Sequence, residues 1–416
     1  MHLERFELND LGPILTANLK LDSHFNVLAG VNGAGKSTIS SVIATMLGRY
    51  SAVLRTGKAA GSFDREKVRR GARFARAAAT ACASRNDDAG RFTWSAAIFR
   101  PGPRLPGLTH SRQLVEFAAA QAEEIERNPE RASLPIVVFY SVNRAVLDIP
   151  LRIRSKVPLG QYAALEDALS QGGRSFRTFF AWFRDREDFE NEIRAEGGRR
   201  RDSQLTAVRD AIANMLPGFE NLRVERQPLR MLITKGSVEL RVDELSDGEK
   251  CLLAMVGDLA RRLAIANPGL RTPLHGSAIA LIDELELHLH PAWQREAVIH
   301  LRETFPSCQF IITTHSPQVL SEVTPEAIFL LRDGRVLQPS RSHGRDSNLI
   351  LEELMDAPSR PAWAAVELEA LYEAIDDEKM DVARERLRAL EERLGVEDPG
   401  LTAARALLAP GSVVRQ

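Results

Sequence analysis

The sequence is organised around Gly30-Val31-Asn32-Gly33-Ala34-Gly35-Lys36-Ser37-Thr38. The apolar run Phe25-Asn26-Val27-Leu28-Ala29 before it predicts a buried strand, and the apolar spacing from Thr38 to Leu47 predicts a helix after it. A strand, a glycine-rich turn and a helix are the context in which the pattern G-x-x-x-x-G-K-[ST] binds phosphate. Gly33 and Gly35 allow backbone N–H groups to converge on an anion at the helix N-terminus. The sequence therefore predicts a nucleotide-binding phosphate loop.

Side chains of this loop supply further groups that a nucleotide needs. Lys36 places a point charge at the outer phosphates, and the Ser37 hydroxyl is suited to bind Mg²⁺. We therefore expect ATP and Mg²⁺ as ligands. The expected nucleotide-binding residues of this segment are Asn32, Gly33, Ala34, Gly35, Lys36, Ser37 and Thr38.

Length, charge and cysteine content narrow the class of protein. The 416 residues can bury a large core and favour two or more structural lobes. A net charge of −1 means that any nucleic-acid surface has to be local. The three scattered cysteines fit a reducing compartment without a disulfide framework. No apolar stretch is long enough to span a bilayer and no signal peptide opens the chain, so we expect a cytoplasmic protein without membrane contact.

Two later segments predict the second half of the ATP site. Ala278–Ile282 is a continuous apolar run that ends in Asp283-Glu284, and Phe310–Thr314 predicts a further buried strand that ends at His315. Asp283 is placed to hold Mg²⁺, and Glu284 can polarise a water for attack on the γ-phosphate. His315 can sense that phosphate and orient the water.

A third segment, Leu245-Ser246-Asp247-Gly248-Glu249-Lys250, opens an amphipathic helix. A Ser-x-Gly turn at a helix N-terminus can hold an anion with backbone N–H groups and a hydroxyl. The same residues also fit an ordinary N-cap with a capping glutamate. We include Ser246, Gly248 and Glu249 among the expected nucleotide-binding residues.

The chain resembles the ABC-type ATPases of the RecF, SMC and OLD group in four motifs and in their order. These motifs are the phosphate loop, Leu-Ser-Asp-Gly-Glu-Lys, Leu-Ile-Asp-Glu-Leu-Glu-Leu-His-Leu-His-Pro and Thr-Thr-His-Ser-Pro. The resemblance implies a dimer of two heads that sandwich ATP, with Ser246 and Gly248 completing the partner's site. It also implies that Glu284 is the catalytic base, that His315 is the switch histidine, and that residues 287–291 form the D-loop at the dimer interface. Asp247 and Glu249 replace the glycine and glutamine of transporters, which disfavours a transporter ATPase.

The expected fold is α/β: a P-loop NTPase head of the ABC type with an antiparallel β subdomain, a helical insertion and a C-terminal helical appendage. The expected domains are an N-terminal ATPase lobe (1–50), a mixed insertion and helical lobe with a core strand near 135–144 (51–243), a C-terminal ATPase lobe (244–340) and the helical appendage (341–416). In the appendage, Asp376 and Asp377 fall in a turn between helices, so we expect no nuclease there.

Softer features extend the resemblance to the stand-alone ATPase subunits of bacterial anti-phage operons, of which the Septu-type ATPase, usually encoded beside an HNH nuclease, is an example. These features are Phe179-Phe180-Ala181-Trp182-Phe183, Leu229-Arg230-Met231 and Gly344-Arg345-Asp346-Ser347-Asn348. The resemblance implies a homodimeric ATPase that controls a separate effector, with an HNH-type nuclease as the suspected partner. A larger oligomer and nucleic-acid binding remain open. The alternative is a DNA-repair ATPase of the RecF or SMC kind that binds DNA directly.

Several segments admit two interpretations. The basic run from Arg65 to Arg76 is either a solvated helix face or a phosphate-contacting patch, and the aromatic helix from Ser175 to Glu192 favours core packing over base stacking. The loop of Arg144 is the expected equivalent of the Q-loop. Glu284, Glu286, His288 and His290 resemble zinc ligands, but their spacing is not that of helical zinc motifs.

Overall fold

The computed structural model describes residues 1–84, 87–102, 105–142, 160–170, 175–197 and 201–409. The chain divides into two compact units, Met1–Ile350 and Leu351–Gln416. Each unit has a hydrophobic core of its own. Within the described residues, no helix has both the length and the apolar character needed to cross a bilayer.

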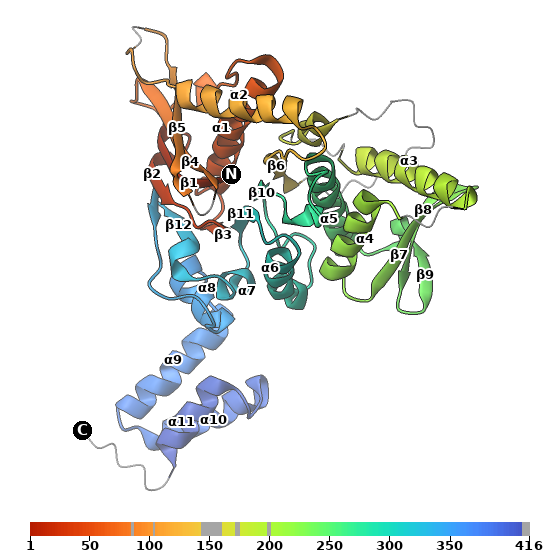
Figure 1. The fold of residues 1–416 in the computed structure, drawn as a ribbon. Helices are drawn as coiled ribbons and strands as arrows, with labels where there is room; N and C mark the ends of the chain where they lie inside the picture. The colour runs from red at the N-terminus through yellow and green to blue at the C-terminus, as the bar shows by residue number, and fades with distance from the viewer. Residues whose placement is uncertain (85–86, 103–104, 143–159, 171–174, 198–200, 410–416) are drawn as a thin grey trace. The chain divides into compact units, whose positions relative to one another are not determined.

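A six-stranded sheet forms the centre of the first unit, in the order β13-β12-β3-β11-β10-β6 (Figure 1). All its strands except β13 run parallel. Every residue of β3, β6, β10 and β11 is buried, which is why these strands are mostly apolar in the sequence. The strands are Phe25–Ala29 (β3), Ile136–Tyr140 (β6), Ala278–Ile282 (β10), Cys308–Thr314 (β11), Ile328–Arg332 (β12) and Arg335–Leu337 (β13).

A four-stranded antiparallel sheet, in the order β2-β1-β4-β5, forms a second layer. Buried and less buried residues alternate along β4, so one face of this sheet joins the core. The Trp94 indole of β5 donates a hydrogen bond to the Met46 carbonyl of α1 at 3.1 Å, which fixes this helix against the sheet. The elements are His2–Leu11 (β1), Ile14–Lys20 (β2), Phe74–Ser84 (β4), Asp87–Phe99 (β5), Lys36–Thr56 (α1) and Arg112–Arg127 (α2).

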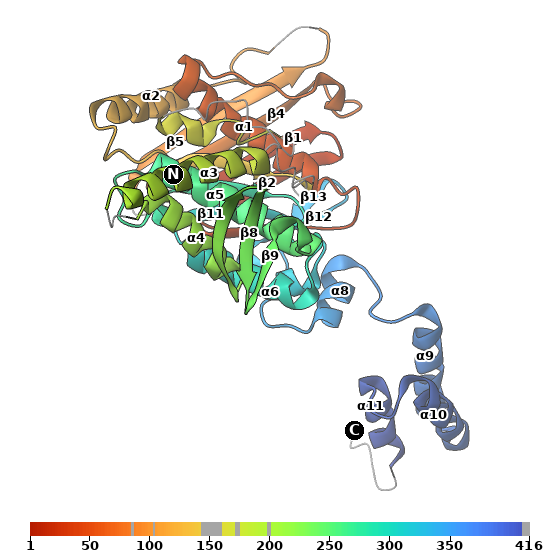
Figure 2. The same ribbon diagram turned by 90° about the vertical axis from the view of Figure 1, so that its right-hand side faces the viewer.

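A third layer combines helices α3, α4 and α5 with the three-stranded sheet β7-β8-β9, which lie side by side in both views (Figures 1 and 2). The aromatic face of α3 is buried, as the sequence favoured, and Phe179 packs so closely on α5 that a Cβ on Gly257 would lie 2.8 Å from its ring. Only Phe189 of the aromatic residues on this helix is half exposed, at 50%. The elements are Ser175–Ala195 (α3), Ser203–Met215 (α4), Phe219–Arg226 (β7), Leu229–Lys235 (β8), Val238–Arg241 (β9) and Asp247–Ala266 (α5).

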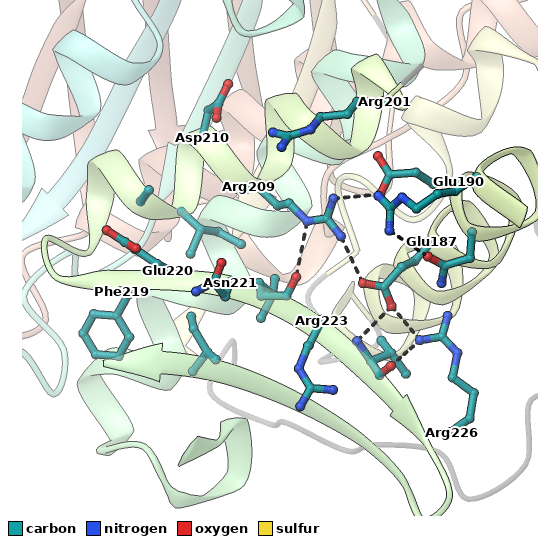
Figure 3. Close-up of a pocket in the computed structure, with 17 residues that line it drawn as sticks. Glu187, Glu190, Arg201, Arg209, Asp210, Phe219, Glu220, Asn221, Arg223 and Arg226 are labelled. Atoms are coloured by element: carbon teal, nitrogen blue, oxygen red, sulfur yellow. Dashed lines mark hydrogen bonds and ion pairs between the residues drawn. The ribbon is translucent and has the colours of Figure 1, made fainter. Parts of the chain in front are cut away.

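Ion pairs between side chains that line a cavity join α3, α4 and β7 in this layer. Arg209 lies between two buried glutamates and donates to Glu187 at 3.0 Å and to Glu190 at 3.1 Å (Figure 3). Arg226 donates to the other oxygen of Glu187 at 2.6 Å. Because these charges pair with one another, the network fastens the helices to the sheet.

The remaining helices of the first unit follow the central strands. They are α6 (Pro291–Thr304), α7 (Pro317–Ser321) and α8 (Ser347–Met355), the last of which spans the boundary between the units. Histidine and serine side chains cap α6 and α7: Ala292 N–H donates to His290 Nδ1 and Val319 N–H donates to Ser316 Oγ.

The second unit contains the helices Ala362–Asp376 (α9), Met380–Leu394 (α10) and Pro399–Leu408 (α11). Leu368, Leu371, Leu387 and Leu390 form one cluster, so the apolar stripes of these helices close on one another. Arg360 also donates two hydrogen bonds to Asp398, at 2.8 and 2.9 Å.

Candidate functional site

The phosphate loop joins β3 to α1 and has the backbone shape that anion binding needs. Gly33 and Gly35 have φ angles of 80° and 108°, a region that other residues rarely adopt. At Gly35 a Cβ would lie 2.6 Å from Ile14 Cδ1 and 2.9 Å from Pro13 Cγ. The β1–β2 turn therefore packs against the loop. Residues 31–33 at the tip are exposed, where a ligand phosphate can reach them.

Lys36 is buried beneath this loop, with 6% of its surface exposed. Its Nζ donates to the carbonyl oxygens of Gly30 at 2.8 Å and Val31 at 3.2 Å. Burial lowers the pKa of Lys36, while the charges of Asp283, Glu284 and Glu286 act in the opposite direction. No carboxylate in the described part of the chain forms an ion pair with this ammonium group. A buried cation that is bonded to carbonyls alone fits a phosphate ligand.

Asp283 and Ser37 form the pair that would hold Mg²⁺. Asp283 follows β10 and is 7% exposed, and the Ser37 hydroxyl lies 3.5 Å from its Oδ1. The Thr313 hydroxyl donates to the same Oδ1 at 2.5 Å, which fixes the carboxylate. Carboxylate and hydroxyl oxygens are hard ligands of the type that Mg²⁺ prefers, so this donor set fits the ion.

Glu284 and His315 stand at the ends of the neighbouring strands β10 and β11. Glu284 has a φ of 49°, and its N–H donates to Thr313 Oγ1 at 2.8 Å. Such a backbone conformation is costly for glutamate and is often found at functional sites. Burial lowers the pKa of His315 and the charge of Lys36 lowers it further, against the opposite effect of Glu284, Glu286 and Asp283, so the neutral imidazole is favoured. Charges of Asp283, Glu284 and Lys36 reach His315, so the structure brings these predicted groups together.

Glu286 holds the tip of β11 rather than a metal ion. One oxygen of its carboxylate accepts from the Thr314 hydroxyl at 2.7 Å, and the other accepts from the His315 N–H at 2.5 Å. His288 and His290, which resemble zinc ligands in the sequence, are exposed. Among the described residues, no three histidine, cysteine or acidic side chains are grouped so that they could bind a metal.

The Ser246 segment begins helix α5 with a capping box. Glu249 N–H donates to Ser246 Oγ at 3.4 Å, and Ser246 N–H donates to Glu249 Oε2 at 2.8 Å. Lys235 Nζ donates to the other Glu249 oxygen at 2.6 Å. Burial alone would raise the pKa of Glu249, but these hydrogen bonds outweigh it and lower the pKa. The contacts of Glu249 are thus those of a helix cap, and its role in nucleotide binding stays a prediction.

Gly248 packs against the loop that follows Glu284. A Cβ at this position would lie 2.4 Å from the His288 carbonyl oxygen. No hydrogen bond between described residues joins Ser246 to the phosphate loop of the same chain. The predicted action of Ser246 and Gly248 on a partner's nucleotide stays a prediction as well.

A buried charge network connects α5 to the central sheet. The Tyr140 hydroxyl of β6 donates to Asp258 at 3.1 Å, and Arg261 and Arg262 donate to the same carboxylate at 2.7 and 2.6 Å. All four side chains are at most 4% exposed. Burial alone would raise the pKa of Asp258, but the two arginines lower it, so the carboxylate stays charged.

Sequence reasoning missed several residues of the site and misjudged one segment. Thr313, Glu286 and Asp258 were not singled out for these contacts. The basic run from Arg65 to Arg76 does not lie on an α-helix: it begins with a short 3-10 turn, Arg65–Lys67, continues in a loop and ends at Arg76 on β4. The Arg144 loop, the expected equivalent of the Q-loop, lies outside the described residues.

A phosphate loop after β3, an acidic pair after β10 and a histidine after β11 define an ATPase site of the P-loop class. Residues 25–321 match the family described as "AAA domain, putative AbiEii toxin, Type IV TA system". The chain belongs to this family.

Three relatives support the assignment. The protein named "Retron Ec83 probable ATPase" of Escherichia coli is 30% identical over 87% of this chain and 76% of its own length. "Retron Vc95 probable ATPase" of Vibrio cholerae serotype O1 biovar El Tor is 29% identical over 64% of this chain and 62% of its own length. "Septu protein PtuA" of Bacillus thuringiensis is 22% identical over 76% of this chain and 72% of its own length. The resemblance to ATPases of this group is thereby confirmed.

Among solved structures, an SMC head bound to the C-winged helix domain of ScpA aligns with a TM-score of 0.52. The alignment covers 82% of this chain and 98% of that chain at 18% identity, so the likeness is one of fold. The predicted α/β class of an ABC-type head is confirmed.

Proposed function

We propose that this chain is the ATP-hydrolysing subunit of an anti-phage defence complex and that it controls a separate effector nuclease. Lys36 follows β3, Asp283 and Glu284 follow β10, and His315 follows β11, and these three strands are neighbours in the sheet. This placement carries the ATPase part of the proposal. The names of the retron and Septu relatives support the defence part.

Each side chain has a role that its surroundings support. Lys36 neutralises the outer phosphates. Ser37 and Asp283 would hold Mg²⁺, which would supply positive charge to the β- and γ-phosphate oxygens. Glu284 accepts a proton from the attacking water. His315, neutral and close to Lys36, can donate or accept a hydrogen bond at the γ-phosphate without adding charge.

In this proposal two heads sandwich ATP, and Ser246 and Gly248 of one head complete the site of the other. The exposed phosphate loop tip supports such an arrangement, because a second surface has to cover it to exclude water.

Substitution Glu284→Gln tests hydrolysis. We expect turnover to fall by about two to four orders of magnitude, since a general base contributes that much, while ATP binding and the closed dimer remain. Phosphate release, calorimetry and light scattering measure the three properties, with exposed Glu296→Gln as the matched control. Normal turnover in Glu284→Gln would remove Glu284 from the catalytic role.

Subunit mixing tests the shared site. Lys36→Ala and Ser246→Arg should each be inactive alone, while hybrid dimers keep one intact composite site and recover part of the activity. No recovery despite measured subunit exchange would argue against the head dimer.

The second unit is the candidate surface for the effector. Trp363, Val366 and Val382 remain exposed there, at 41%, 63% and 44%, outside the cluster that α9, α10 and α11 form. Truncation before Ala362 should leave ATP hydrolysis nearly unchanged and abolish co-purification with the co-encoded effector. An intact complex after truncation would place the docking surface in the first unit.

A second candidate function is direct DNA binding, which an exposed cationic loop favours. Arg65, Lys67, Arg70 and Arg73 are exposed, and no acidic side chain of the described residues pairs with them. Contacts of this kind give weak, salt-dependent binding to phosphates. Tight ATP-dependent binding to DNA ends by the chain alone, abolished in Arg70→Glu/Arg73→Glu, would favour a DNA-repair ATPase over the effector-controlling subunit.

A further inference from the structure

We propose that Glu286 is a positioning residue for His315 and that the loop 283–291 links Gly248 to this histidine within one chain. The first half of this loop is fastened to the end of β11 over consecutive residues. Glu284 N–H donates to the Thr313 hydroxyl at 2.8 Å and Leu285 N–H to the Thr313 carbonyl at 3.2 Å. The Glu286 carboxylate then accepts hydrogen bonds from the Thr314 hydroxyl and the His315 N–H.

A second connection reaches the other side of His315. Gln294 of α6 donates its amide N–H to the Leu289 carbonyl at 2.9 Å, and its amide oxygen accepts from the Ser316 hydroxyl at 2.6 Å. His315 is therefore held on both sides by contacts that end on the same loop. Two turns keep the loop compact between these connections. In the first, the Leu287 N–H donates to the Glu284 carbonyl at 3.0 Å, and in the second, the Leu289 N–H donates to the Glu286 carbonyl at 2.9 Å.

The tip of the loop contacts the helix that carries Gly248. His288 has a φ of 63°, and its carbonyl is so close to Gly248 that a methyl group there would overlap it, at 2.4 Å. A movement of the N-terminus of α5 therefore displaces the loop, and the loop displaces His315 through Glu286 and Gln294.

The assignment rests on the proposed function, in which His315 acts on the nucleotide that its own chain binds.

Hydrogen exchange in the nucleotide-free full chain tests the role of Glu286 without using ATPase activity. Glu286→Ala removes the acceptor of the His315 N–H, so we expect this amide to exchange about tenfold faster, the ratio that corresponds to one net hydrogen bond. Glu296→Ala, which removes an exposed carboxylate from α6, is the matched control and should leave the exchange unchanged.

Kinetics separate positioning from general stability. Glu286→Ala should lower kcat about tenfold or more and change the Kd for ATP less than twofold. Glu286→Gln should restore kcat to within about threefold, because its amide oxygen can accept from His315 N–H while its NH₂ donates to the Thr314 hydroxyl. The assignment would be overturned if the His315 amide exchanged at the same rate in Glu286→Ala as in the wild type. It would also be overturned if the kcat of Glu286→Gln were as low as that of Glu286→Ala.

The link to Gly248 has its own test. Gly248→Ala should accelerate exchange at His315, whereas Gly257→Ala, which crowds Phe179 on the same helix, should not. Should Gly248→Ala fail to fold, His288→Gly loosens the same contact and should act in the same direction. If neither variant alters the His315 amide, the link is wrong. A wild-type chain without ATP hydrolysis would overturn only the proposed function, since the exchange experiments need no nucleotide.

Discussion

The phosphate loop and the loop 283–291 form the two halves of one site, but different interactions determine their shapes. The phosphate loop is shaped by its own backbone, with Gly33 and Gly35 at positive φ and Lys36 bonded to carbonyls a few residues away. The loop 283–291 is shaped by side chains of β11, about 30 residues distant in sequence, and by Gln294 of the helix α6 that follows it. The first half therefore depends on local spacing, whereas the second depends on which strands are neighbours.

Loss of Lys36 should give the largest effect of these three variants, because it should weaken ATP binding in addition to abolishing hydrolysis. In Lys36→Ala the phosphates lose a buried charged partner, and hydrogen bonds to charged groups contribute about 1.5–3 kcal/mol. We expect the Kd for ATP to rise about 10- to 100-fold, with exposed Lys20→Ala as the control in calorimetry. An unchanged Kd would show that the phosphate loop does not carry nucleotide affinity.

Thr313→Val should affect the second half of the site more gently. The valine keeps the approximate shape but removes the hydroxyl that contacts Asp283 and the Glu284 N–H. We expect kcat to fall about tenfold and the apparent affinity for Mg²⁺ to weaken, while ATP binding measured without the ion stays the same. Thr80→Val on β4 is the control. Equal losses in both threonine variants would mean that the effect is not specific to this loop.

The smallest expected effect is a pH dependence that belongs to His315. Its pKa in the folded chain lies below the ordinary value, so the neutral form is favoured by folding. This contribution to stability is fully present above about pH 6.5, the ordinary histidine value, and is lost as the pH falls through the lower folded pKa. Thermal unfolding of wild type and His315→Gln without nucleotide should therefore differ more at pH 7 than at pH 5. A difference that grows on acidification would contradict the neutral imidazole.

The same contrast explains how much the sequence could predict. The phosphate loop, the buried strands and the positions of Asp283, Glu284 and His315 follow from contiguous motifs and apolar runs. The roles of Thr313 and Glu286 could not be predicted, because their hydrogen-bond partners depend on the register between β10 and β11. Ile282 of β10 lies opposite Ile312 of β11, so the next residues, Asp283 and Thr313, contact each other. Once two parallel strands are known to be neighbours, their first polar residues can be matched in this way.

Other differences have similarly physical reasons. Helix α1 extends to Thr56, beyond the expected end at Leu47, because Val53 and Leu54 are also buried against the core. The basic segment near Arg65 lacks the apolar spacing of a helix. Its backbone instead lies beside the β1–β2 turn, where the Gly12 N–H donates to the Lys67 carbonyl at 2.7 Å. Charge content alone did not reveal this backbone pairing.

The buried carboxylate of Asp258 limits which parts of the first unit can move independently. Asp258, Arg261 and Arg262 all lie on α5 and pair with one another, so separating α5 from β6 would break the Tyr140–Asp258 hydrogen bond. A hydrogen bond to a charged group contributes about 1.5–3 kcal/mol. Arg262 adds bonds to the carbonyls of Ala164 and Glu166, so three segments are held together. The stretch of α5 from Asp258 to Arg262 is therefore fixed to β6 and to the segment of Ala164 and Glu166. A nucleotide-dependent movement that keeps these bonds leaves the spacing of this stretch and β6 unchanged, so a spin-label distance between them should stay constant through the ATPase cycle.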